Sequence, residues 1–259
     1  MSHKRRYPGS PRRVETRAVT KLRQLADARV AERGRTFFKK DDAVPLYGVK
    51  AAAVHGLVRE IHNSVKHTWD LAHAVEFCNA MARRPELEAK LTGLLLLGRF
   101  QRRFQPDLLD AVGSWLAEDR LSSWAAVDGL CAAVTSPLLR AHPGLLQPIV
   151  QWAQGASRWQ RRAAVVTLVP FARRGEYLGE AYELADRLAG DPEDLIHKAC
   201  GWLLREAGKT DPERLIQYLE RRGHGLPRTT VRYAIERLDR SERRRLLDVS
   251  RSDGGQRGR

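Results

Sequence analysis

The sequence predicts an all-α protein, and more closely an α-solenoid in which pairs of helices stack as tandem repeats. Apolar residues recur at spacings of three and four, and no alternating strand pattern appears. Three expected helix starts, at Ser123, Ser157 and Asp191, follow one another at intervals of 34 residues. A period in the thirties with two helices per unit is typical of an α-solenoid, whereas a globular bundle, the alternative, needs no such period.

Prolines and glycines mark the ends of the expected helices. Prolines stand at or just before the first turn of several segments, where a missing N–H costs nothing, and glycines follow their last turns. The expected helices cover residues 13–33, 49–64, 69–84, 86–103, 106–118, 123–134, 143–153, 158–173, 177–189, 192–207, 212–222, 227–238 and 241–249. We expect one helical-repeat domain over residues 13–249, between a basic tail at 1–12 and a second tail at 250–259.

The charge balance indicates a polyanionic partner. The chain has 46 Lys and Arg residues against 31 Asp and Glu, a formal net charge of +15. The end segments 1–15 and 250–259 hold +4 and +2, which leaves +9 on residues 16–249. A body this basic favours nucleic acid as a partner, although a basic surface that serves only solubility is the alternative. Composition excludes a collagen-like, disulfide-scaffold or wholly disordered chain.

Several classes of protein find no support in the sequence. No apolar run approaches the length of a membrane span, so we expect no membrane partner. The three cysteines are dispersed in helical segments, which favours buried thiols in a reducing compartment. The common nucleotide-binding, hydrolase and zinc-protease motifs are absent from the sequence. The spacing of His62, His67 and His73 is poor for a metal, so we expect neither metal nor cofactor.

Two of the equivalent helices display tryptophans beside charged residues. In 192–207, Lys198, Trp202 and Arg205 lie opposite the apolar stripe. In 123–134, Trp124 and Asp128 are i, i+4 neighbours on the edge of the core face. A carboxylate there would repel phosphate, so it either pairs with an arginine of the protein or meets positive charge on a bound partner. The tryptophans likewise either pack internally or contact a ligand.

The helix 158–173 begins with a basic and aromatic turn. Arg158, Trp159, Arg161 and Arg162 occupy its first positions. Cations at a helix N-terminus oppose the helix dipole, which indicates phosphate contacts as their purpose. Solvated arginines are the alternative.

Three blocks of sequence resemble the AlkD-type DNA alkylation-repair glycosylases. They are Ser-Trp-Ala-Ala-Val-Asp at 123–128, Trp-Gln-Arg-Arg-Ala-Ala-Val at 159–165 and Lys-Ala-Cys-Gly-Trp-Leu-Leu-Arg-Glu at 198–206. Their order and separation also match, and the resemblance extends over about residues 45–240. It implies HEAT-like repeats with a basic concave surface for duplex DNA. It further implies a monomeric, cytoplasmic enzyme that acts at the bacterial nucleoid. The implied reaction excises cationic N3- or N7-alkylated purines with water and no cofactor, and it leaves open whether bulky adducts are also substrates.

The resemblance also implies roles for individual residues. Asp128 would be the catalytic carboxylate, and Trp124 and Trp202 would lie against the sugar–phosphate backbone of the lesion nucleotide. Arg162 would hold the nearby phosphates, with Lys198 and Arg205 as further DNA-contacting or helix-supporting residues. One early aromatic of the family remains open among Phe37, Phe38 and Tyr47.

The expected chemistry needs only one carboxylate. An alkylated cationic purine leaves as a neutral base, so no general acid has to protonate it, unlike ordinary glycoside hydrolysis. An anion held against the oxocarbenium-like sugar stabilises the charge that develops there. An open groove would serve this reaction without a pocket for a flipped base. The competing hypotheses are a non-catalytic protein that binds distorted or branched DNA, and a protein–protein scaffold.

Overall fold

The computed structural model describes residues 9–38 and 44–250, and this part of the chain contains helices and no strand. The predicted all-α fold class is therefore confirmed. The chain divides into two compact units, Met1–Pro143 and Gly144–Arg259. The predicted tails lie almost wholly outside the described residues, except that the first helix already begins at Pro11. No helix in the described ranges is long and apolar enough to cross a membrane.

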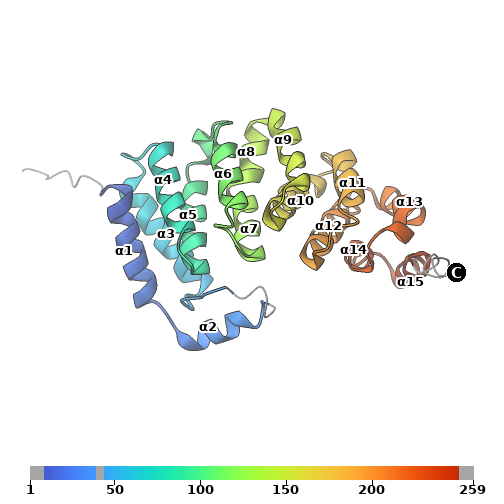
Figure 1. The fold of residues 1–259 in the computed structure, drawn as a ribbon, viewed down its shortest axis with the longest axis horizontal. Coiled ribbons are helices and arrows are strands. Elements are labelled where there is room, and N and C mark those ends of the chain that lie inside the picture. Colours follow the sequence, from blue (N-terminus) through green and yellow to red (C-terminus); the bar gives the residue numbers. More distant parts are fainter. Residues whose placement is uncertain (1–8, 39–43, 251–259) are drawn as a thin grey trace, which may run out of the picture. The chain divides into compact units, whose positions relative to one another are not determined.

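The first unit stacks successive helices around an aliphatic core. Helix α5 lies at its centre and contacts α3, α4 and α7 (Figure 1). Phe77 and Met81 on α4, Leu94 and Leu97 on α5, and Leu116 on α6 are fully buried. The helices are α1 (Pro11–Gln24), α2 (Ala28–Arg35), α3 (Ala51–Val65), α4 (Leu71–Ala82), α5 (Leu87–Gly98), α6 (Leu108–Ala117), α7 (Trp124–Leu130) and α8 (Ser136–Ala141).

The second unit shows the repeat most clearly. Its helices are α9 (Leu146–Gln151), α10 (Arg158–Ala172), α11 (Leu178–Arg187), α12 (Asp194–Ala207), α13 (Pro212–Arg222), α14 (Arg228–Ala234) and α15 (Arg240–Val249). Alternate helices touch directly, so that α10 contacts α12 and α12 contacts α14, while α11 and α13 pack against α12 (Figure 1). This is the arrangement of tandem helical pairs, in which the same member of each pair forms one continuous row.

Polar contacts also follow the repeat period. The Arg173 guanidinium bonds to Glu206 at 2.7 Å, and the Thr230 hydroxyl donates to the His197 carbonyl oxygen at 3.1 Å. Both bonds join residues 33 positions apart. Each repeat is therefore tied to the next by side chains as well as by apolar packing.

The segment predicted as one helix over residues 13–33 is two helices. The break lies between Gln24 and Ala28. Asp27 starts the second helix, because its carboxylate accepts the backbone N–H groups of Arg29 and Val30 at 2.8 and 3.3 Å. An aspartate in this position satisfies N–H groups that would otherwise lack acceptors at the start of a helix.

The helix predicted over residues 123–134 is longer than expected. After α7 the backbone forms a π-helical turn over Cys131–Thr135 and then continues as α8 to Ala141. Pro137 follows directly in the first turn of α8. A π turn of this kind absorbs an irregularity without ending the helix.

Four other helices differ from the prediction in their boundaries. Residues 86–103 form α5 and a separate 3-10 turn, and residues 143–153 form α9 between two such turns. Helix α14 ends at Ala234 rather than near residue 238. Helix α12 begins at Asp194, so Asp191 is not its N-cap, although Ser123 and Ser157 do cap α7 and α10 as predicted.

Candidate nucleic-acid interface

Helix α7 carries the tryptophan and the carboxylate that the sequence singled out. The Ser123 hydroxyl accepts the Ala126 N–H at 3.2 Å and fixes where the helix begins. Val127 and Leu130 are fully buried on the core face. Trp124 and Asp128, one turn apart on the adjacent edge, are only partly buried. Both side chains therefore keep surface that a ligand could reach.

A second aromatic ring lies against Trp124. The ring centroids of Phe38 and Trp124 are 5.5 Å apart, with planes tilted by 31°. This is a favourable distance for an aromatic pair. Of the three early aromatics left open by the sequence, Phe38 is thus the one that joins the tryptophan. Phe37 instead exposes 75% of its surface, and the Tyr47 hydroxyl oxygen is buried.

The Tyr47 hydroxyl group points into the protein. Burial, followed by the nearby Glu86 carboxylate, raises the pKa of Tyr47 above its ordinary value. Both effects disfavour the phenolate, so Tyr47 stays neutral over the physiological pH range.

An apolar pocket of about 390 Å³ opens beside Trp124. Its walls come from α2, α3, α5, α7 and the segment that precedes α3. Among the lining residues are Phe37, Phe38, Leu46, Leu91, Leu95 and Trp124. The sequence did not predict this pocket, because its walls come from helices that lie far apart in the chain.

Glu88 holds the wall of this pocket in place. Its carboxylate, buried on α5, accepts the backbone N–H groups of Tyr47, Gly48 and Val49 at 3.0, 2.8 and 3.0 Å. Gly48 has a φ of +81°, and a Cβ there would lie 2.0 Å from the Asp27 carbonyl oxygen. Only glycine allows the segment to approach α2 this closely. The role of Glu88 was not predicted from the sequence, because a single acidic residue in a helix is usually exposed to solvent.

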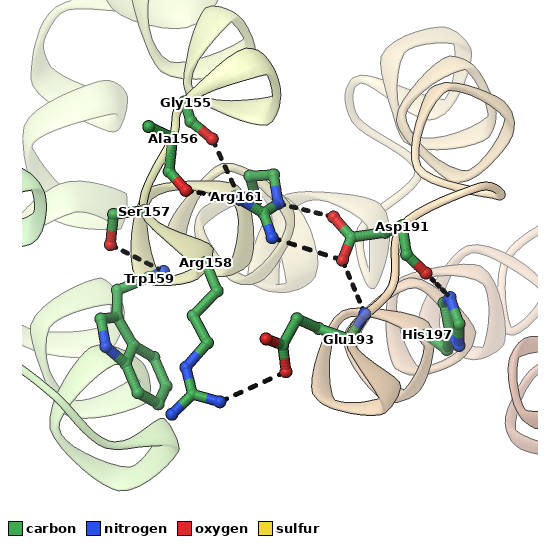
Figure 2. Close-up of polar contacts among 9 residues, drawn as sticks. All are labelled: Gly155, Ala156, Ser157, Arg158, Trp159, Arg161, Asp191, Glu193 and His197. Atoms are coloured by element: carbon green, nitrogen blue, oxygen red, sulfur yellow. Dashed lines mark hydrogen bonds and ion pairs between the residues drawn. The ribbon is translucent and has the colours of Figure 1, made fainter.

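In the second unit, the basic first turn of α10 is held by contacts within the protein. Trp159 is 3% exposed, and the Arg158 guanidinium lies 4.5 Å from its ring centroid. Arg158 also pairs with Glu193 at 3.2 Å, as Figure 2 shows. The Trp159 ring therefore packs within the protein, and its predicted contact with DNA stays a prediction.

Arg161 uses most of its donors on internal acceptors. Its Nε lies 2.6 Å from Asp191 Oδ2, and its Nη1 donates to the carbonyl oxygens of Gly155 and Ala156 at 3.1 and 2.9 Å (Figure 2). Asp191 also accepts the Glu193 N–H at 2.9 Å. These bonds give a physical reason for an arginine at a helix start that does not require a phosphate.

Arg162 and the charged residues of α12 follow the same pattern. Arg162 is 6% exposed and donates to the Leu195 carbonyl oxygen at 2.8 Å. Lys198 pairs with Asp194 at 2.9 Å, and Arg205 pairs with Glu236. Trp202 lies between them along the helix and is partly buried.

These contacts partly neutralise the positive charge of the predicted interface. The cations expected to meet phosphate each already have a carboxylate or carbonyl partner within the second unit. A sequence signal for this existed, because Asp191 and Glu193 lie about one repeat period after Arg158 and Arg161. Their contacts with DNA stay a prediction.

The burial and the grouping of the described cysteines and histidines decide whether they have thiolate character or form metal-binding groups. All three cysteines are buried, as predicted. Burial raises the pKa of Cys200 to about 12 and raises that of Cys78 as well, so both stay protonated thiols. Within residues 9–38 and 44–250, no three His, Cys, Asp or Glu side chains are grouped to hold a metal ion.

Comparison with known proteins identifies the family. A family model described as DNA alkylation repair enzyme matches residues 18–238. Among solved structures, a predicted DNA alkylation repair enzyme from Enterococcus faecalis is similar with a TM-score of 0.73 and 18% identity, covering 83% of this chain and 97% of that one. At this identity the likeness establishes the fold alone. No curated protein sequence matches the chain. Because the family match spans most of the sequence, the chain belongs to the DNA alkylation repair enzyme family.

Proposed function

We propose that this protein is a monofunctional DNA glycosylase that hydrolyses the N-glycosidic bond of cationic N3- or N7-alkylated purines in duplex DNA. The observation that carries the proposal is the pair Trp124 and Asp128, partly exposed on one edge of α7 in a member of a DNA alkylation repair family. The basic body of the chain supports duplex DNA as the partner.

Asp128 is the proposed catalytic group. As the alkylated base departs, positive charge grows on the deoxyribose, and a carboxylate held beside the sugar stabilises that charge. The same oxygens can orient the attacking water and take up its proton. The base leaves as a neutral molecule, so the C–N bonding electrons return to the purine ring and no acid is needed.

Trp124 and Trp202 are the proposed walls against the sugar of the lesion nucleotide. The Phe38 ring, packed on Trp124, extends the first wall and fixes its orientation. A wall of aromatic faces holds the deoxyribose by dispersion and excludes water around the developing cation. Arg162, Lys198 and Arg205 are the proposed phosphate contacts.

Arg158 and Arg161 are proposed to support the interface from within. Their bonds to Glu193 and Asp191 fix the segment that leads into α12. Helix α12 carries Trp202, so these arginines position a wall of the site. This role adds to the phosphate contacts predicted from the sequence and does not depend on them.

Release of a free base is the test. Duplex DNA methylated at purines is incubated with the protein, and 7-methylguanine and 3-methyladenine are quantified with time. The proposal expects both bases to be released without strand cleavage, in the presence of a metal chelator. Tight binding to branched DNA with no base release would favour the non-catalytic hypothesis instead. DNA affinity that is weak and independent of salt would favour the scaffold, since phosphate contacts weaken steeply as salt rises.

A further inference from the structure

Lys90 is a buried cation that the proposed mechanism does not use. It lies on α5 and is 5% exposed, although a lysine is almost never buried to this degree unless it is paired. Burial lowers the pKa of its ammonium group, and the Glu86 carboxylate opposes this effect in part. Because removing a charge from water is costly, its position indicates a specific role in the structure around it.

The Lys90 ammonium group joins two segments that lie apart in the sequence. It donates to the Ala82 carbonyl oxygen at 2.9 Å and also to the Arg120 carbonyl oxygen. Ala82 is the last residue of α4, where carbonyl groups lack helical partners and a cation is favourable. Arg120 lies in the segment that leads from α6 to α7. Lys90 therefore fastens this segment to α4 and α5.

Asn79, on α4, also holds Arg120. The Asn79 side-chain oxygen accepts the Arg120 guanidinium and, at 3.1 Å, the Trp115 indole N–H. The Arg120 backbone N–H donates to the Trp115 carbonyl oxygen at 3.0 Å. The preceding Asp119 has a φ of +53°, a left-handed conformation that aspartate adopts more readily than most residues. Arg120 is thus bonded through its N–H, its carbonyl oxygen and its side chain.

The fastened segment leads directly into the proposed site. Three residues separate Arg120 from Trp124. Of these, Leu121 is fully buried, and Ser123 is 1% exposed while its hydroxyl group caps α7. A link this short and this well packed passes any shift of Arg120 to the first turn of α7. That helix carries both Trp124 and Asp128.

We propose that Lys90 is a positioning residue, which fixes the start of α7 and thereby the place of Asp128 beside the deoxyribose. The inference rests on the proposed function, because it takes Asp128 as the catalytic group. A displacement of about 1 Å can cost about 10²-fold in rate even when the mutated residue is far from the chemistry. Binding of the duplex depends on many contacts along the protein surface, so it is expected to change little.

The test compares the rate of base release with the affinity for a lesion duplex. Single-turnover release of 7-methylguanine at saturating protein gives the rate. A duplex with one 2′-fluoro-7-methylguanine nucleotide, whose fluorine slows glycosidic cleavage, gives the affinity. Lys90→Met keeps the length of the side chain and removes the ammonium group. Asn79→Ala removes the second hold on Arg120, whereas Asn79→Asp keeps an acceptor oxygen there.

A control variant separates positioning from a general loss of stability. Val58→Ala removes part of a fully buried side chain on α3, a helix that contributes no hydrogen bond to Arg120. Urea denaturation defines a temperature at which each variant is folded, and all rates are measured there.

The expected result is a loss of rate without a loss of binding. Lys90→Met releases the base about 10- to 100-fold more slowly, with a lesion affinity within about twofold of wild type. Asn79→Ala is slower by at least about threefold, while Asn79→Asp and Val58→Ala react within about twofold of wild type. Folded Lys90→Met with the wild-type rate would overturn the inference, as would an equal loss in Val58→Ala. If Lys90→Met does not fold, the wild-type rate in Asn79→Ala overturns it.

Hydrogen exchange gives a readout that does not depend on the reaction. The Ala126 amide, which bonds to the Ser123 hydroxyl group, should exchange faster in Lys90→Met than in Val58→Ala. Equal exchange in the two variants would show that Lys90 does not hold the start of α7. Wild-type protein that releases no base is a distinct result, which rejects the proposed function and the positioning role with it.

Discussion

Arg161 and Asp191 form a two-pronged ion pair between the start of α10 and the segment before α12, with Nε–Oδ2 at 2.6 Å and Nη2–Oδ1 at 3.4 Å. The Asp191 side chain is 3% exposed and that of Arg161 is 15% exposed. The pair thus ties two successive repeats at a point largely shielded from water.

The first prediction concerns this pair. Arg161→Ala leaves the buried Asp191 carboxylate without its main partner, which we expect to cost about 3–5 kcal/mol of unfolding free energy. Arg222→Ala removes a similar pair to Asp186 at the surface, where Arg222 is 57% exposed, and should cost at most about 1 kcal/mol. Urea denaturation measures both. Equal losses in the two variants would contradict the role given to Arg161.

Glu88 gives a second prediction. Glu88→Gln keeps the size of the side chain but provides one acceptor oxygen for three backbone N–H groups. Because a buried N–H without an acceptor costs about 1–3 kcal/mol, stability should fall by at least that amount. Hydrogen exchange should accelerate at Tyr47, Gly48 and Val49 more than in α10. Unchanged exchange at these amides would show that Glu88 does not hold the segment.

The third prediction is that the ion pairs of Glu206 make the stability of the protein depend on pH. Burial raises the pKa of its carboxyl, but hydrogen bonds from Lys209 and Arg173 outweigh burial and leave the pKa below its usual value. The stabilisation is therefore fully present above the ordinary glutamate pKa and is lost as the pH falls through the lowered one. The stability difference between wild type and Glu206→Gln should shrink as the pH falls below about 4. A difference that is constant between pH 7 and 3 would contradict this account.

The rings of Phe38 and Trp124 should act together. If their contact supports the proposed site, Phe38→Ala and Trp124→Ala are not additive in kcat/KM for base release. A double-mutant cycle should give a coupling of about 0.5–1.5 kcal/mol, as for other aromatic pairs. The matched cycle of Tyr182 and Tyr218, whose centroids are 4.7 Å apart in the second unit, should affect stability with no coupling in kcat/KM. Additive losses for Phe38 and Trp124 would separate Phe38 from the site.

Much of the fold could be predicted from the sequence because helical periodicity and capping are local. Ser123 and Ser157 cap the expected helices, and a spacing of 33 residues, close to the expected period of 34, recurs in bonds such as that from Arg173 to Glu206. The break at Asp27 was missed because the apolar pattern continues across it while the capping bond depends on a single side chain.

The candidate site was predictable only in part. Trp124 and Asp128 share a helix edge, which spacing alone determines. The contact of Phe38 with Trp124 and the anchoring of the pocket wall by Glu88 join residues far apart in the sequence. Such contacts depend on tertiary packing, which a single sequence does not encode in any local pattern.

The most direct test of the central claim is single-turnover release of 7-methylguanine by Asp128→Asn, beside Asp110→Asn as a control for an exposed carboxylate of the same unit. The account predicts that Asp128→Asn loses at least about 10²–10³ in rate. Its affinity for the lesion duplex should stay within about twofold, and Asp110→Asn should react as wild type. Release by Asp128→Asn at the wild-type rate would contradict the assignment of Asp128 as the catalytic carboxylate.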